Sequence, residues 1–135
     1  MLLLSQIALP AILDNLPKLM DSVSHCLRGQ GFESEKVIEI EIALEEALVN
    51  IINYAYRDRS GDVKVSCSVD DESRFIIEIE DTGQPFDVLS ANQPDLSDNI
   101  SERKVGGLGI HLIRNLMSEV QYLRKDDKNI LQLIP

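Results

Sequence analysis

The sequence predicts an α/β fold, a two-layer sandwich in which helices pack on one face of a mixed, largely antiparallel sheet. Two stretches with helical spacing of apolar residues come early in the chain, and the stretches with alternating spacing that follow are arranged as hairpins. The 135 residues fit one compact domain, which we expect to cover residues 1–135. Single strands and helices do not alternate along the chain, so the pattern disfavours Rossmann and P-loop folds.

The first half of the chain is expected to contain an edge strand followed by two helices. Apolar residues 2–9 predict the strand, and the helical spacing within residues 10–28 predicts a helix that Gly29 ends. Ser34 is the expected N-cap of a longer helix that runs to about residue 56, because apolar residues recur there at helical intervals.

The second half of the chain is expected to hold two hairpins separated by a long loop and a helix. Residues 63–69 and 75–80 alternate between apolar and polar side chains, which predicts a hairpin with one buried face. Residues 84–105 lose this periodicity and are rich in Pro, Ser, Asn and Asp, which is typical of a lid or binding loop. Helical spacing returns at residues 106–117, and residues 120–134 predict the last hairpin.

The composition limits the classes of function. The chain has 23 acidic and 13 basic residues and a formal net charge of −10, so its own field disfavours nucleic acid as a partner. The apolar first ten residues are too short to span a membrane and lack a basic leader, so we expect a cytoplasmic protein with no membrane partner. Cys26 and Cys67 lack the spacing of metal ligands and are expected to be buried, reduced thiols.

One face of the second helix carries a narrow polar stripe. Polar residues opposite an apolar stripe ordinarily form the hydrated face of an amphipathic helix, and this interpretation is favoured for the stripe alone. Apolar residues flank the stripe closely, however, and asparagine is a poor helix former in the middle of a helix. Glu46 and Asn50, one turn apart, are therefore also candidates for a site. The stripe consists of Glu39, Glu46, Asn50, Asn53 and Arg57.

Two glycine motifs follow in the chain. The segment Asp81-Thr82-Gly83 ends a predicted strand, and Asp and Gly are ordinary turn formers. A carboxylate at that position can also accept a hydrogen bond from an exocyclic amine, and a neighbouring glycine lets a flat ring approach the backbone. The segment 106–109, Gly-Gly-Leu-Gly, opens a helix after Arg103 and Lys104, and exposed amides at a helix start can hold phosphates.

Taken in order, these motifs resemble the ATP-binding domain shared by gyrases, heat-shock chaperones, sensor histidine kinases and mismatch-repair ATPases. The match is closer to the anti-sigma factor serine/threonine kinase family, a single-domain branch of the GHKL histidine-kinase-like ATPase superfamily. The resemblance covers about residues 31–120 and is carried by EEALVNIINYAY, EDTGQPFD and VGGLGIHLIRNLMSEV. The last strand, residues 129–134, departs from the superfamily because it lacks the Gly-Thr pair that often approaches the nucleotide.

The resemblance implies ATP and Mg²⁺ as cofactors and gives each motif a role. Asn50 would coordinate the magnesium ion, and Glu46 would be the general base that takes the proton from an attacking hydroxyl. Asp81 would bind the adenine amino group with Gly83 beneath the ring, and residues 84–106 would form the lid. Further nucleotide contacts are implied for Asn53, Arg103, Lys104, Gly106, Gly107, Leu108 and Gly109.

The resemblance further implies a protein serine/threonine kinase that phosphorylates an anti-sigma antagonist of the STAS type and sequesters a sigma factor. It also implies a homodimer. An alternative is a switch module that holds ATP or ADP and regulates a partner without phosphoryl transfer. A scaffold with a vestigial site is a third possibility, but it predicts loss of Asn50 or Asp81, and both are present.

Overall fold

The computed structural model describes residues 1–85 and 107–135. Most of the expected lid, including Arg103, Lys104 and Gly106, lies outside the described residues. The elements, in chain order, are β1 (Leu2–Pro10), a short 3-10 helix (Leu13–Asn15), α1 (Leu16–Gly29), α2 (Ser34–Tyr54), β2 (Asp62–Val69), β3 (Phe75–Asp81), α3 (Gly107–Leu116), β4 (Glu119–Lys125) and β5 (Lys128–Ile134).

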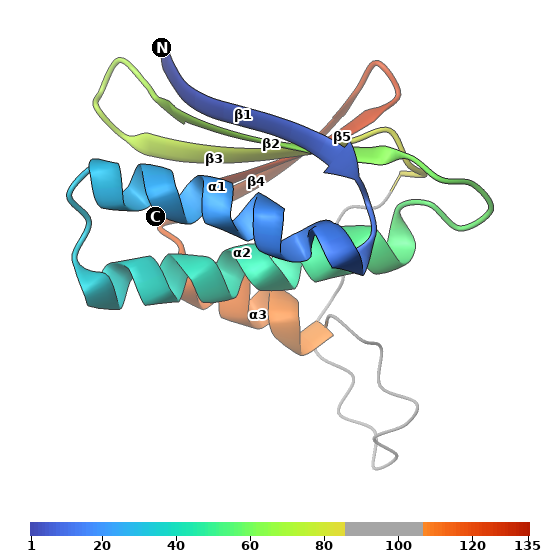
Figure 1. The fold of residues 1–135 in the computed structure, drawn as a ribbon, viewed down its shortest axis with the longest axis horizontal. Helices are drawn as coiled ribbons and strands as arrows, with labels where there is room; N and C mark the ends of the chain where they lie inside the picture. Colours follow the sequence, from blue (N-terminus) through green and yellow to red (C-terminus); the bar gives the residue numbers. More distant parts are fainter. Residues whose placement is uncertain (86–106) are drawn as a thin grey trace.

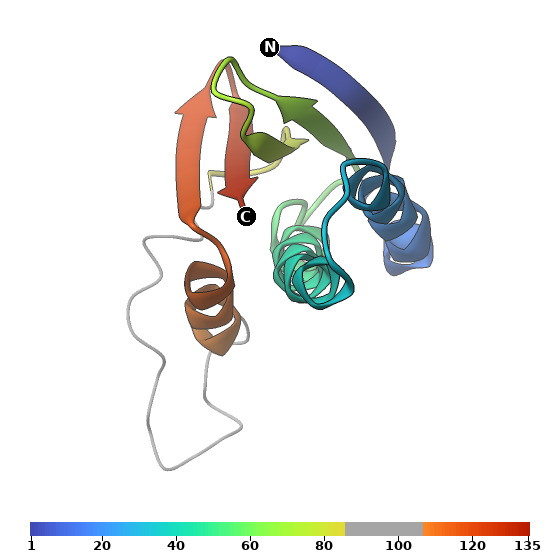
Figure 2. The same cartoon turned by 90° about the vertical axis from the view of Figure 1, so that its left-hand side faces the viewer.

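The fold is a two-layer α/β sandwich, as the sequence predicts. The five strands form one sheet in the order β1-β2-β3-β5-β4, and the three helices lie side by side beneath one of its faces (Figures 1 and 2). The four strand pairings in the described residues are all antiparallel, so the sheet is not mixed. β5 takes the inner position and β4 the edge, and β5 accordingly buries more of its side chains.

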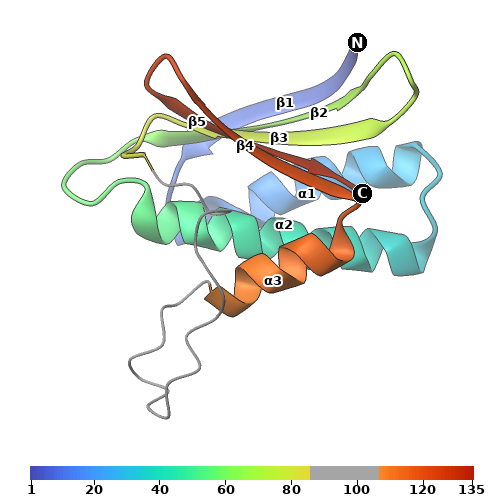
Figure 3. The same cartoon turned by 180° about the vertical axis from the view of Figure 1, so that it is seen from behind.

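The hydrophobic core fills the space between the helices and the sheet. Alternate side chains of β2 and β3 point toward the helices and are almost fully buried, as expected for strands with one covered face. α2 lies between α1 and α3 and packs against both (Figure 3), so it is buried on more than one side. Core residues with no exposed surface include Leu19, Ile40, Leu44, Leu48, Ile77, Ile79 and Leu133.

The first two α-helices begin at other residues than the sequence predicts. β1 continues through Pro10, which pairs with Asp62, and α1 begins only at Leu16 after a 3-10 turn. Pro17 lies in the first turn of α1, where a missing backbone N–H leaves no helical hydrogen bond unmade. The N-cap of α2 is Glu33 rather than Ser34, and no side chain caps this end of the helix.

Both cysteines are free thiols, as expected from the sequence. Cys67 is fully buried in β2, whereas Cys26 on α1 is only half-buried. Burial raises the pKa of the Cys67 thiol to about 12, so this thiol stays protonated at neutral pH. Within the described ranges, every helix is too short or too polar to cross a lipid bilayer.

Candidate functional site

The candidate site begins where β3 ends, at Asp81. The side chain of Asp81 is only 3% exposed, and its Oδ1 accepts hydrogen bonds from the Gly83 amide and from Asn129 Nδ2, both at 2.9 Å. Asn129 lies directly opposite Asp81 in the β3–β5 register and is itself buried. Two hydrogen bonds therefore fix one carboxylate oxygen of Asp81 in place.

The environment of Asp81 shifts its titration. Burial raises the pKa of this carboxyl above its ordinary value, while the hydrogen bonds from Asn129 and Gly83 and the charge of Arg124 oppose the rise. Both of these hydrogen bonds reach Oδ1, and Oδ2 has no hydrogen-bond partner among the described residues. Oδ2 is the atom of this side chain that can serve a ligand.

Gly83 brings the end of β3 against the end of α2. A Cβ atom at this position would lie 2.2 Å from the carbonyl oxygen of Ala55, and the next amide, that of Gln84, donates to the same oxygen at 2.9 Å. The glycine is thus required by the packing of two backbones, whatever ligand binds nearby. This close approach places Asp81 beside the helix that carries Glu46 and Asn50.

Gly83→Ala is therefore expected to lower the free energy of unfolding by at least about 1–3 kcal/mol, because the backbone of Ala55 cannot move aside cheaply. Gly29→Ala is the matched control: apart from its chain neighbours and the backbone of its own helix, no heavy atom of the described residues lies within 4 Å of the added methyl group, and the unfolded chain loses entropy. Urea unfolding of both variants measures the difference. Equal stabilities would contradict the assignment of a packing role to Gly83.

Tyr56 fastens the end of α2 to the same strand ends. Its hydroxyl accepts a hydrogen bond from the Thr82 amide at 2.8 Å and donates to the carbonyl oxygen of Asp62 at 2.6 Å. Arg59 packs over the Tyr56 ring and donates to the carbonyl oxygen of Thr82. The backbone that follows Asp81, and the start of the neighbouring strand β2, are therefore held by side chains as well as by the sheet.

Asn50 is the unusual residue of α2. It is 2% exposed, and its Nδ2 has no hydrogen-bond partner among the described residues. A buried amide without a partner costs about 1–3 kcal/mol, and such groups are rare in folded proteins. Glu46, one helical turn earlier, is half-buried, and Asn53, one turn later, is exposed. The polar stripe of α2 is therefore not uniformly hydrated.

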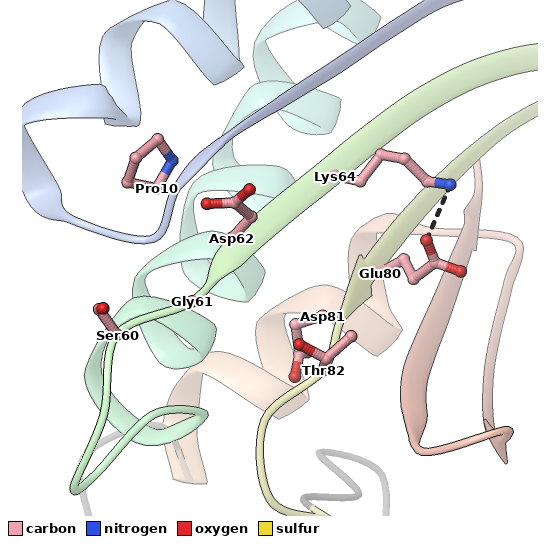
Figure 4. A pocket seen from close by; sticks show the side chains of 8 residues that line it. All are labelled: Pro10, Ser60, Gly61, Asp62, Lys64, Glu80, Asp81 and Thr82. Atoms are coloured by element: carbon pink, nitrogen blue, oxygen red, sulfur yellow. Dashed lines mark ion pairs between the residues drawn. The ribbon is translucent and has the colours of Figure 1, made fainter.

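A hollow of about 510 Å³ lies at the ends of β1, β2 and β3 that adjoin Asp81 (Figure 4). It is lined by Pro10, Ser60, Gly61, Asp62, Lys64, Glu80, Asp81 and Thr82. Two of its charged residues pair with each other: Lys64 Nζ lies 2.8 Å from Glu80 Oε2, and Lys128, from outside the lining, approaches the other oxygen of Glu80 at 3.6 Å. Burial tends to raise the pKa of Glu80, but the two ammonium groups lower it below its ordinary value. Among the described residues, no group of three or more His, Cys, Asp or Glu side chains that could hold a metal ion occurs here or elsewhere.

The structure unites some of the predicted site residues. Asp81, Gly83 and the end of α2 meet, and α3, which packs against α2, begins at Gly107, so Gly107, Leu108 and Gly109 belong to its first turn. Sequence reasoning missed Asn129. The signal was present, because Asn129 shares the alternation of the buried Leu131 and Leu133, which predicts an inward-facing amide.

Comparisons with known proteins agree with this architecture. A family model described as the histidine kinase-like ATPase domain matches residues 9–134. The chain is 28% identical over 105 residues to the serine-protein kinase RsbW of Bacillus thuringiensis (strain Al Hakam). That match covers 75% of this chain and 65% of the relative, so the chain spans less than two thirds of the relative's length.

Two solved structures share the fold. The RsbU and RsbW domains of Rv1364c from Mycobacterium tuberculosis superpose with a TM-score of 0.66 at 14% identity, covering 97% of this chain and 32% of that one. The blue-light activated histidine kinase EL346 of Erythrobacter litoralis gives a TM-score of 0.56 at 20% identity, covering 90% of this chain and 40% of that one.

Proposed function

Because the chain belongs to the family of histidine kinase-like ATPase domains, we propose that it binds ATP with Mg²⁺ and transfers a phosphoryl group to a serine or threonine of a regulatory protein. The observation that carries the proposal is the unpartnered amide of Asn50. A buried donor with no acceptor in the described chain is costly, and a phosphate oxygen of a bound nucleotide would satisfy it.

The adenine end of the nucleotide fits Asp81. Oδ2 accepts hydrogen bonds, and the exocyclic amine of adenine donates them. Burial of this carboxylate strengthens its interaction with a donor because little water competes. Gly83 has no side chain and packs closely against Ala55, so the backbone next to Asp81 is free of a bulky side chain that would obstruct a flat ring.

Asn50 is also the proposed magnesium ligand. Its side chain offers one carbonyl oxygen, and Mg²⁺ prefers oxygen ligands, of which one or two usually come from the protein and the rest from phosphates and water. The ion supplies charge neutralisation between the phosphates and a protein whose formal charge is −10. Asn53, Arg103, Lys104 and the segment Gly106–Gly109 remain proposed phosphate contacts.

Glu46 is the proposed general base. Its carboxylate lies one helical turn from Asn50, so the two side chains leave α2 on the same side. A half-buried carboxylate in this position can accept the proton of a serine or threonine hydroxyl as that oxygen attacks phosphorus. Phosphoryl transfer needs mainly positioning and charge stabilisation, so few catalytic side chains suffice.

The proposed substrate is an anti-sigma antagonist of the STAS type, and a sigma factor is a second proposed partner. The relative named a serine-protein kinase supports a protein substrate, and the resemblance of the motifs supports the anti-sigma branch. A homodimer is proposed on the same resemblance.

Incubation of the purified chain with γ-labelled ATP, Mg²⁺ and STAS-type proteins of the same genome tests the proposal. We expect label on a serine or threonine of one such protein, located by mass spectrometry. A chain that binds ATP but labels none of them would instead be a nucleotide-dependent switch. Release of free phosphate without protein label would assign the attacking hydroxyl to water.

A further inference from the structure

Four polar side chains form a connected network on the inner side of the sheet. Asn129 of β5 donates through Nδ2 to Asp81 Oδ1 at 2.9 Å and to the carbonyl oxygen of Gln84 at 2.8 Å. Its Oδ1 accepts from the Tyr122 hydroxyl at 2.5 Å and from Arg124 Nη1 at 3.2 Å. Both halves of the Asn129 amide are engaged, so its orientation is fixed with the nitrogen toward Asp81.

Asn129 is a buried polar residue in an otherwise apolar row of β5. It is 5% exposed and lies in a row with Leu131 and Leu133 that otherwise faces the apolar core. A buried amide in such a row is costly unless its hydrogen bonds are made, and an apolar residue would pack there without that requirement. Its partner in the β3–β5 register is Asp81, so the amide is placed where it acts on that carboxylate.

Arg124 extends the network to the backbone beyond Asp81. The same Nη1 that contacts Asn129 donates to the carbonyl oxygen of Gly83 at 2.8 Å. Asn129 and Arg124 therefore hold the carbonyl groups of Gln84 and Gly83, respectively, from the β4–β5 hairpin. Both the carboxylate and the backbone that follows it are therefore tied to this hairpin.

The network decides which oxygen of Asp81 meets a ligand. Oδ1 already accepts two N–H groups, so Oδ2 keeps the free lone pairs, and a proton taken up by Asp81 would go to Oδ2. The ionised form then accepts a hydrogen bond from the amine at position 6 of adenine. The protonated form would instead donate, which suits the carbonyl oxygen at position 6 of guanine.

We propose that Asn129 is a positioning residue of the nucleotide site, which holds Asp81 with Oδ2 as a dedicated acceptor and so sets the preference for adenine over guanine nucleotides. This inference rests on the proposed function. Asn129 acts through Asp81 and does not itself contact the base. It is the second residue of β5, close to the turn that joins β4 and β5.

The test is Asn129→Leu, which removes both halves of the amide at similar side-chain volume. Affinities for ATP and GTP are measured by calorimetry between pH 5 and pH 8. We expect ATP affinity at pH 8 to fall about tenfold, as for loss of one buried hydrogen bond to a charged group, and the ratio of ATP to GTP affinity to fall with it.

The pH profile separates positioning from general structural damage. Removal of the Asn129 hydrogen bond raises the pKa of Asp81 further, since that bond opposes the effect of burial. Among the described residues, the charged groups acting on Asp81 are Arg124 from β4, which lowers its pKa, and Glu80 from β3, which raises it. The neighbouring β2 residue in the register, Val63, is apolar. As the pH is lowered, the affinity for ATP should therefore begin to fall at a higher pH in the variant than in the wild type.

Two further variants complete the experiment. Asn129→Thr keeps one donor and should recover part of the affinity and of the pH profile, which also covers the case in which Asn129→Leu fails to fold. Gln132→Leu removes an amide from the same strand, but on the open face, where Gln132 donates to Glu78 at 3.0 Å. This control should match the wild type in affinity, selectivity and pH dependence.

The outcomes are distinct. An Asn129→Leu chain that is folded and retains wild-type ATP affinity, selectivity and pH profile overturns the positioning role but leaves the proposed function standing. A wild-type chain that binds neither nucleotide overturns both. An Asn129→Leu chain whose affinities for ATP and GTP fall equally, with an unchanged pH profile, shows a structural role only and also overturns the inference.

Discussion

Glu46→Ala should abolish phosphoryl transfer while leaving the affinity for ATP largely intact. A positioned general base contributes about 10²–10⁴-fold to the rate of a proton-coupled transfer, and no binding contact to the nucleotide is assigned to this carboxylate. Glu46 lies on α2 one turn before Asn50, half-buried and on the same side of the helix. Removal of its carboxylate leaves the adenine end of the site, at Asp81, untouched.

The measurement pairs calorimetric titration with ATP and the rate of label transfer from γ-labelled ATP to the partner protein. Glu45→Ala is the matched control, since it removes the same group from the next position of α2, where the side chain is exposed. The control should transfer at the wild-type rate. A Glu46→Ala chain that loses ATP binding as completely as an Asn50 variant would show that base and ligand-binding roles are not separate.

Asn50→Leu should weaken magnesium-dependent binding of ATP by more than tenfold and at the same time leave the fold as stable as before, or more stable. The loss of affinity follows from removal of the proposed metal ligand and of the amide donor. The gain in stability has another cause: the variant removes a buried Nδ2 that has no partner in the described chain. Such an unsatisfied donor lowers the free energy of unfolding by about 1–3 kcal/mol.

A lower affinity for ATP together with an unchanged or higher free energy of unfolding would show that Asn50 serves ligand binding rather than the stability of the fold. Ser24→Ala supplies the contrast, because Ser24 is also buried and polar but donates to Glu41 Oε2 at 2.7 Å. That variant should lose stability and keep its affinity for ATP. A less stable Asn50→Leu chain with unchanged affinity would mean that Asn50 serves the fold rather than a nucleotide.

Local periodicity was enough to predict most of the fold. The two-residue alternation in β2 and β3 and the helical spacing in α2 reflect which side chains face the core, and both survive in the structure. The start of α1 was missed because pairing of Pro10 with Asp62 extends β1, and that pairing joins segments some fifty residues apart along the chain. Propensity alone carries no information about such distant contacts.

The candidate site was predicted only where its residues form a local motif. Glu46 and Asn50 share one helix, and Asp81 and Gly83 share one turn, so spacing exposed both pairs. Asn129 comes 48 residues after Asp81 and meets it only through the register of β3 and β5. The unpartnered amide of Asn50 was likewise invisible, because it depends on the packing of α2 between α1 and α3.

We propose that the polar face of α2 and the end of β3 form one magnesium-dependent ATP site. The most direct measurement is calorimetric titration of the wild-type chain with ATP, with Mg²⁺ and again with Mg²⁺ removed by chelation. We predict saturable binding of one ATP per chain that weakens markedly without the metal. Heat of dilution alone under both conditions would contradict the claim.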